Sequence, residues 1–177
     1  RLRHIHQLAL TYLLYPGASH KRFEHSLGVM ELAGRVFDVI TNRELLTTSS
    51  EDLRVTLPDL FDVEALPYWR QVVRLAALLH DTGHLPFSHA AEHALLPEGI
   101  NHESLTRAVI MSPRMQSIWS AHRPQINPED IVKLAIGPDV ASDLAFTTWE
   151  GLLYEIIGGN AFGVDRMDYL LRDSYHT

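Results

Sequence analysis

Cysteine is absent from this chain of 177 residues. Disulfide bonds, thiolate nucleophiles and cysteine-ligated zinc are therefore excluded, and the absence fits a cytoplasmic protein. Apolar runs of membrane-spanning length are absent too, and the opening Arg-Leu-Arg-His lacks the apolar stretch of a signal peptide. We therefore expect a cytoplasmic protein that has no membrane partner.

Positive charge is also scarce, with 15 Lys and Arg against 22 Asp and Glu and a net charge of −7. An acidic protein repels nucleic acids and anionic membranes, so nucleic acid is not an expected partner. For a phosphate-ester substrate, local Arg, His or metal charge must overcome this field. Most of the positive charge is arginine, whose planar guanidinium matches phosphate oxygens.

The apolar periodicity is helical throughout, without repeats and without a convincing run of strands. We therefore expect an all-α fold. The length suits one domain, and because the sequence starts at Arg1 rather than Met we expect a piece of a longer protein. Residues 41–67, with weak periodicity, are expected to form an exposed insertion with at most one short turn. The expected helices cover 2–15, a segment from about His25 to Ile40, 69–80, 88–96, 102–111, a segment that begins at Asn127, 149–157 and 164–175, with N-caps at Asn101, Asn127 and Thr148.

The segment 79–92 concentrates the chemistry of the chain. An apolar run ends in the pair His80-Asp81, and Gly83 then breaks the helix. Imidazole and carboxylate side chains at the end of a core helix are typical ligands of divalent metals. The same segment adds three more candidate side chains, His84, His89 and Glu92. The alternative interpretation is a buried histidine capped by an aspartate.

Three further segments carry candidate residues. His25 lies at the start of a helix and His102 follows the Asn101 cap, and each alone could be an unremarked surface histidine. In the helix 164–175, acids, Tyr and Arg recur at helical spacing, while Met167, Leu170 and Leu171 are expected to pack inward. The alternative here is a salt-bridged surface helix. The polar positions of that helix are Asp165, Asp168 or Tyr169, Arg172 and Asp173.

Taken together, His25, His80-Asp81 and Asp165 resemble the ligand set of the HD superfamily of metal-dependent phosphohydrolases. The likeness extends over most of the chain outside 41–67, and it is greatest to the deoxynucleoside triphosphate triphosphohydrolase branch. It implies an HD-domain helical bundle, with 1–177 as a single HD phosphohydrolase domain that cleaves dNTPs to deoxynucleoside and triphosphate. The matching segments are RLRHIHQLALTYLLYPGASHKRFEHSLGVMELA, HDTGHLPFSHAAEH, NHES and VDRMDYLLRDSYHT.

The resemblance also implies roles for individual residues. One divalent ion, whose identity among Mn, Mg, Fe, Ni, Co and Zn stays open, would be held by the metal ligands His25, His80, Asp81 and Asp165. The expected catalytic residues near the phosphates are His84, His89, Glu92 and His102. Among them His102, oriented by Glu92, would act as general acid or as nucleophile.

The substrate contacts follow from the same resemblance. Arg22 and Arg166 would hold phosphate oxygens. The same resemblance implies that the protein is a homo-oligomer. The residues implied for the sugar and the nucleoside are Tyr169, Asp173, Gln7 and Leu8.

Some features depart from the family pattern or leave alternatives open. Arg166 stands where Lys is frequent, Glu92 where Asp also occurs, and Ala9 where Gly is common. Guanosine-tetraphosphate hydrolases have acidic residues in place of Thr82-Gly83-His84, and the Gly-Tyr-Pro signature of cyclic-dinucleotide phosphodiesterases is not found. Another nucleotidase, a single-strand nuclease, or a non-catalytic nucleotide sensor on the HD fold remain as alternatives.

Overall fold

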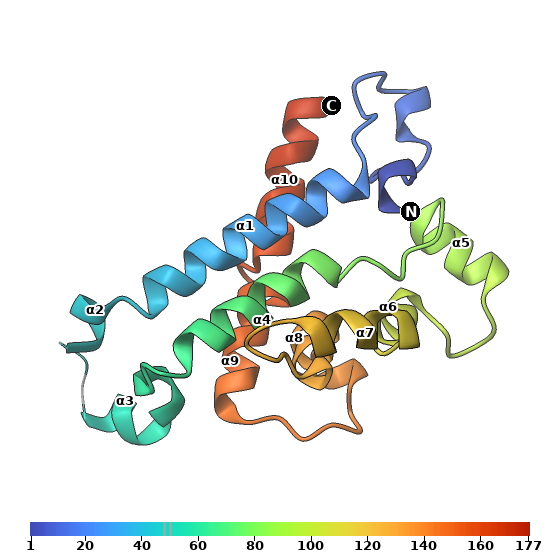
Figure 1. Ribbon diagram of the computed structural model, residues 1–177. Coiled ribbons are helices and arrows are strands. Elements are labelled where there is room, and N and C mark those ends of the chain that lie inside the picture. The colour runs from blue at the N-terminus through green and yellow to red at the C-terminus, as the bar shows by residue number, and fades with distance from the viewer. Residues whose placement is uncertain (48, 50) are drawn as a thin grey trace.

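A computed structural model describes residues 1–47, 49 and 51–177 (Figure 1). Over these residues the chain is helical and forms no β-strand, only an isolated antiparallel bridge between His6 and Lys21. The predicted all-α fold is thus confirmed. Within the same described ranges, no helix combines the length and apolarity needed to cross a membrane. The α-helices are α1 (Arg22–Ile40), α2 (Arg43–Thr47), α3 (Glu51–Thr56), α4 (Leu66–Leu79), α5 (Ser88–Leu95), α6 (His102–Ile110), α7 (Pro113–Ala121), α8 (Pro128–Val140), α9 (Thr148–Gly158) and α10 (Val164–His176).

The core is built around α4, whose buried face carries small and β-branched side chains. Val72 and Ala76 have no exposed surface, so neighbouring helices can approach α4 closely. Helix α1 packs against α4 and α10, while α8 packs against α4, α6 and α9 (Figure 1). Phe37 of α1 meets Trp149 of α9 with ring centroids 6.3 Å apart. This packing fixes the end of α4 relative to the starts of α1 and α10.

The helix starts are set by local capping, largely as predicted. The Asn101 side chain accepts a hydrogen bond from Ser104 N at 2.9 Å, and that of Asn127 accepts one from Glu129 N at 3.2 Å. The prediction of Thr148 as the cap of α9 was wrong by one residue. Thr147 is the cap, because its hydroxyl accepts from Glu150 N and the Glu150 carboxylate accepts from Thr147 N, a reciprocal pair that satisfies two helix-end donors.

The predicted helix over 2–15 was wrong. The structure has two single 3-10 turns, Leu2–His4 and Thr11–Leu13, in place of a helix. Besides the local bonds of these turns, the backbone here bonds to the residues around the start of α1: Arg22 N donates to Ile5 O, and Gln7 N donates to the carbonyl of His20, both at 3.0 Å. Tertiary pairing has overridden the helical periodicity of this segment.

The segment 41–67 is more helical and better attached than predicted. It contains α2, α3 and the 3-10 turn Pro58–Phe61, and Leu46 and Leu60 are buried in the core. Thr48 and Ser50, which the predicted insertion included, lie outside the described residues. Helix α4 starts at Leu66, three residues before the predicted start, because Pro67 is tolerated in a first helical turn.

Two leucines expected to pack inward do not. Leu170 and Leu171 of α10 are 57% and 69% exposed. On α10 the buried positions are instead Val164 and Asp168, with Met167 partly buried against the core. A buried carboxylate on this helix requires a partner.

Candidate active site

The His80-Asp81 pair follows directly on the last residue of α4 and is tied to α6. The Thr106 hydroxyl donates to His80 O and accepts from Gly83 N, both at 2.9 Å. Gly83 has no room for a side chain, because a Cβ would lie 1.8 Å from the backbone oxygen of His102. The turn after α4 and the first turn of α6 therefore hold each other in a fixed position.

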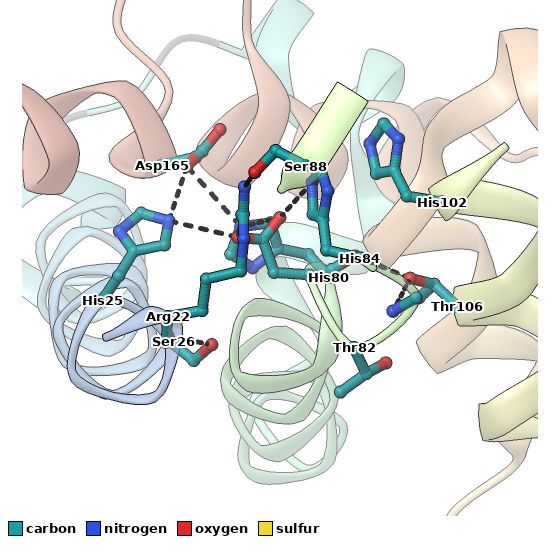
Figure 2. A network of polar contacts seen from close by, with 12 residues as sticks. Arg22, His25, Ser26, His80, Thr82, His84, Ser88, His102, Thr106 and Asp165 are labelled. Atoms are coloured by element: carbon teal, nitrogen blue, oxygen red, sulfur yellow. Dashed lines mark hydrogen bonds and ion pairs between the residues drawn. The ribbon is translucent and has the colours of Figure 1, made fainter. Parts of the chain in front are cut away.

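Three of the predicted metal ligands, His25, His80 and Asp165, offer ligand atoms within 4.8 Å of one another (Figure 2). Asp81 lies beside them, and we call these four residues the first cluster. Asp165 Oδ1 lies 3.0 Å from His25 Nε2 and 3.5 Å from His80 Nε2. Asp81 Oδ1 lies 3.3 Å from His80 Nε2. Both imidazole Nε2 atoms are buried and make no hydrogen bond of acceptable geometry within the described residues.

The other ring nitrogens of these histidines fix the tautomers. His25 Nδ1 lies 2.8 Å from Asp168 Oδ2, and His80 Nδ1 lies 2.7 Å from the carbonyl oxygen of Ala77. A carboxylate and a carbonyl only accept hydrogen bonds, so both Nδ1 atoms carry hydrogen. In the neutral ring the Nε2 lone pair then points into the cluster, as metal-ligating histidines require.

The electrostatics of the first cluster fit a cation. Burial opposes charge on His80, but the Asp81 and Asp165 carboxylates raise the pKa of this imidazole to about 9. Burial likewise opposes charge on Asp165, yet the imidazoles of His25 and His80 hold the pKa of this carboxyl below its usual range. Two nitrogens and two carboxylates suit a divalent transition ion, which would displace a proton from the cluster.

The side chain of Arg22 lies against the first cluster rather than in open space. Its guanidinium forms an ion pair with Asp81 Oδ2 and also donates to the Ser88 hydroxyl (Figure 2). Burial opposes charge on Asp81, but His80, His84 and Arg22 hold the pKa of this carboxyl well below its usual range. Arg22 thus pairs with Asp81 and also brings positive charge to the cavity that it lines.

Beside the first cluster lie His84, Glu92 and His102, which we call the second cluster. Glu92 Oε2 accepts from the backbone N–H of His102 at 3.2 Å and lies 3.0 Å from His102 Nδ1. Burial opposes charge on Glu92, but these bonds from His102 hold the pKa of the carboxyl below its usual range. Glu92 therefore orients His102, as predicted for a proton-transfer pair. His89 lies at the edge of the cluster, with a side chain 66% exposed and Nδ1 3.2 Å from Glu92 Oε1.

One cavity of about 330 Å³ brings both clusters together. Tyr154 of α9 also lines it, a residue that no sequence motif had indicated. Glu92 and His25 lie behind the wall, where each contacts a lining residue. The lining residues that the sequence had predicted for the site are Gln7, Arg22, His80, Asp81, His84, His89, His102, Asp165 and Tyr169.

Three predicted substrate residues do not line this cavity. Arg166 is exposed and donates a hydrogen bond to Asn160 O at 2.7 Å. Leu8, which follows Gln7 in the sequence, is half-buried. Asp173 Oδ1 lies 2.9 Å from Nε2 of the buried His20. Their assigned roles stay predictions.

Sequence reasoning missed Asp168 as a site residue. Its carboxylate holds His25 Nδ1 and is itself held by Arg172, through Nε at 2.9 Å and Nη2 at 2.8 Å. Gly28 leaves the space for it, because a Cβ there would lie 1.9 Å from Asp168 Oδ1. The helical spacing of Asp165 and Asp168 was visible, but that both carboxylates meet His25, one at each ring nitrogen, was not.

We expect Asp168→Ala to weaken metal binding by about 10–100-fold, the usual effect of removing a partner behind a ligating histidine. The reason is that His25 loses the acceptor that fixes its ring. Competition with a metal indicator dye measures the affinity. Asp38→Ala is the control, since Asp38 is an ion-paired carboxylate on α1 that pairs with Arg70. Equal affinities in the two variants would contradict a supporting role for Asp168.

Comparison with known proteins now decides the family. The model of the HD domain matches residues 22–173, a stretch that includes both clusters. The chain belongs to the HD domain family. The resemblance inferred from the sequence is thus confirmed for the family as a whole.

Relatives of this HD domain agree along nearly its whole length. It is 34% identical to the deoxynucleoside triphosphate triphosphohydrolase SAMHD1 of Gallus gallus, over 99% of this chain and 29% of that protein. It is 37% identical to the uncharacterized protein MJ1154 of Methanocaldococcus jannaschii, over 100% of this chain and 28% of that one. A crystal structure of a hypothetical protein from Aquifex aeolicus matches with a TM-score of 0.67 and 34% identity, over 99% of this chain and 38% of that chain. The HD domain described here thus spans about a third of the length of these proteins.

Proposed function

We propose that this HD domain is a metal-dependent phosphohydrolase and that its substrate is a dNTP, cleaved to deoxynucleoside and triphosphate. The proposal is carried by one observation: a metal-type donor set and a carboxylate-held imidazole open into the same cavity. A volume of about 330 Å³ lies within the range of small-ligand pockets. The SAMHD1 relatives named as dNTP triphosphohydrolases, similar over both clusters, support the choice of substrate.

The chain's own residues have separable tasks in this mechanism. The first cluster would hold a divalent ion, which would polarise a phosphate oxygen as a Lewis acid and lower the pKa of a water. Arg22 brings positive charge to a cavity in an acidic protein. Glu92 holds Nδ1 of His102, which leaves Nε2 of that ring to give a proton to the leaving oxygen.

The orientation of the His102 ring also matters for the reaction. The His84 and His102 rings stack with centroids 4.0 Å apart, so His102 cannot turn without displacing a buried neighbour. A proton donor held in one orientation needs little reorganisation in the transition state. In this proposal His102 of the second cluster protonates the leaving group, while the first cluster would hold the ion beside the phosphate that is attacked.

A non-catalytic nucleotide sensor is the rival from a different functional class. Both a sensor and an enzyme need the metal and the arginine, but only the enzyme needs the Glu92–His102 pair. Product analysis after incubation of the full-length protein with each dNTP and several divalent ions separates them. Release of deoxynucleoside and triphosphate supports the proposal, whereas binding of dNTP without any product would establish the sensor.

We expect dATP to be cleaved faster than ATP, and Tyr169→Ala to narrow this difference by about tenfold, the scale of one lost packing contact in substrate discrimination. Tyr169 lies one helical turn after Asp165, and both line the cavity, which supports the proposal that its ring crowds a ribose 2′-hydroxyl. The ratio of kcat/KM for the two nucleotides measures the effect.

Tyr175→Ala is the matched control, because Tyr175 lies on the same helix but is 86% exposed. Equal rates on ATP and dATP in the wild type, or release of single phosphate, would contradict the dNTP assignment. The assignment as a metal-dependent phosphohydrolase would still stand.

A further inference from the structure

Two buried atoms in the second cluster face each other without a hydrogen-bond partner. His84 Nδ1 lies 3.4 Å from Glu92 Oε1, and within the described part of the chain neither atom makes a hydrogen bond. Glu92 is 9% exposed and His84 is 3% exposed, so bulk water reaches them poorly. Buried polar atoms without partners are costly, and a cation between this carboxylate oxygen and this imidazole nitrogen would satisfy both.

The surrounding donors have the spacing of a metal site. One atom from each of His84, Glu92 and His102 can be chosen so that all lie within 4.8 Å of one another. Zinc bonds of about 2.0–2.1 Å place neighbouring ligands of a tetrahedron about 3.3 Å apart. Glu92 Oε1 lies 3.4 Å from His84 Nδ1, and the other carboxylate oxygen of Glu92, Oε2, lies 3.0 Å from His102 Nδ1. Figure 2 shows the two rings standing side by side, next to the first cluster.

We propose that His84, Glu92 and His102 form a second metal site that takes a borderline transition ion such as Zn²⁺ or Co²⁺, and that an ion bound there inhibits hydrolysis. The site shares no ligand with the first cluster. Two imidazoles and one carboxylate leave a fourth position for water or for His89, whose Nδ1 lies 3.2 Å from Glu92 Oε1.

The donor set selects the ion. Imidazole nitrogen suits Zn²⁺ and Co²⁺, whereas Mg²⁺ prefers oxygen ligands in an octahedron and keeps several waters. The net charge of the ligands is −1, with both imidazoles neutral, which is enough to attract a divalent cation. The second cluster has one carboxylate beside its two imidazoles, whereas the first cluster has two, so Mg²⁺ is expected to prefer the first cluster and to leave the second free for proton transfer.

His102 would be both a ligand of the second ion and the general acid, and inhibition follows from this double role. This part rests on the proposed function. An ion on His102 Nδ1 takes the place of the proton that Glu92 now holds there. The ring then cannot become an imidazolium, so it loses its capacity as a general acid. The first cluster keeps its own ligands and its ion.

Titration of the metal-free full-length protein with Co²⁺ tests the binding. The visible absorption of Co²⁺ reports its ligands, and elemental analysis after gel filtration counts ions. We expect two ions per chain in the wild type and in His93→Ala, an exposed histidine on the same helix α5. Glu92→Gln should bind the second ion more than tenfold more weakly, and Asp165→Ala should keep the second ion while losing the first.

A single ion in the wild type, or two equally tight ions in Glu92→Gln, would overturn the second site. Glu92→Gln keeps the side-chain shape, and its melting temperature shows whether it is folded. If it is not, His84→Gln serves as the second variant and is expected to lose the same ion.

The inhibition is measured on dATP with rising Zn²⁺ or Mg²⁺. The rate should pass through a maximum with Zn²⁺ and then fall at least tenfold, in parallel with occupancy of the second site, and should reach a plateau with Mg²⁺. A plateau with Zn²⁺ at full occupancy of both sites contradicts the inhibition. Absence of hydrolysis under every condition contradicts the proposed function instead, and the Co²⁺ stoichiometry still decides whether the second site exists.

Discussion

Asp165→Ala is expected to release the ion of the first cluster and to lower the rate of hydrolysis by at least about 10²–10³-fold. Its Oδ1 atom is the carboxylate oxygen closest to His25 Nε2, so its loss opens the ligand set. A metal contributes several kcal/mol to stabilising the transition state, and each 1.4 kcal/mol is tenfold in rate. Metal content and kcat on dATP are measured on the same preparation.

Asp165 is a better test than Asp81. The side chain of Asp165 is 39% exposed, whereas Asp81 is buried against Arg22. Removing one partner of a buried ion pair costs about 3–5 kcal/mol of stability, which would confuse loss of metal with loss of fold. Asp139→Ala, on an exposed position of α8, is the control for removing a carboxylate. Unchanged metal content in Asp165→Ala would remove this residue from the ligand set.

His102→Gln and Glu92→Gln are each expected to lower kcat by about 10²–10⁴-fold while the ion of the first cluster is retained. Neither side chain belongs to the first cluster, and the two are joined by the contact of 3.0 Å between Glu92 Oε2 and His102 Nδ1. Because they act as one unit, the double variant should be little slower than either single variant. Steady-state kinetics with Mg²⁺ measure all three.

His93→Gln is the matched control on α5 and should keep wild-type activity. A loss of less than about tenfold in His102→Gln would exclude this residue as the principal acid. Additive losses of kcat in the double variant would show that Glu92 contributes to catalysis independently of His102.

The sequence predicted most of the helices that start at a strong local cap. Asn101 and Asn127 are caps because their side chains bond backbone N–H groups a few residues ahead, a short-range interaction. Helix α7 was missed, although Ser112-Pro113 carries the same kind of signal. The segment 2–15 was wrong because its backbone pairs with residues 20–22, and a pairing between separate segments leaves no periodic trace in either.

The site was predictable in its composition but not in its connections. The resemblance named the residues of both clusters, and the structure brings them to one cavity. It could not give the carboxylate of Asp168 behind His25, since three-residue spacing on a helix does not say which neighbour the side chain meets. The same limit applies to Leu170 and Leu171, whose apolar character suggested burial on a helix that buries an aspartate.

The Thr106 hydroxyl, which bridges the His80 carbonyl and the Gly83 amide, has a consequence for evolution of the site. The two clusters are joined by short backbone and side-chain links, so neither can drift in position while the other stays. The chain entropy of assembling them is lost once, during folding, and not again at each turnover. Variation in substrate choice is therefore expected at lining positions outside this link, such as Tyr154 and Tyr169, where a side chain can change without moving the reacting groups.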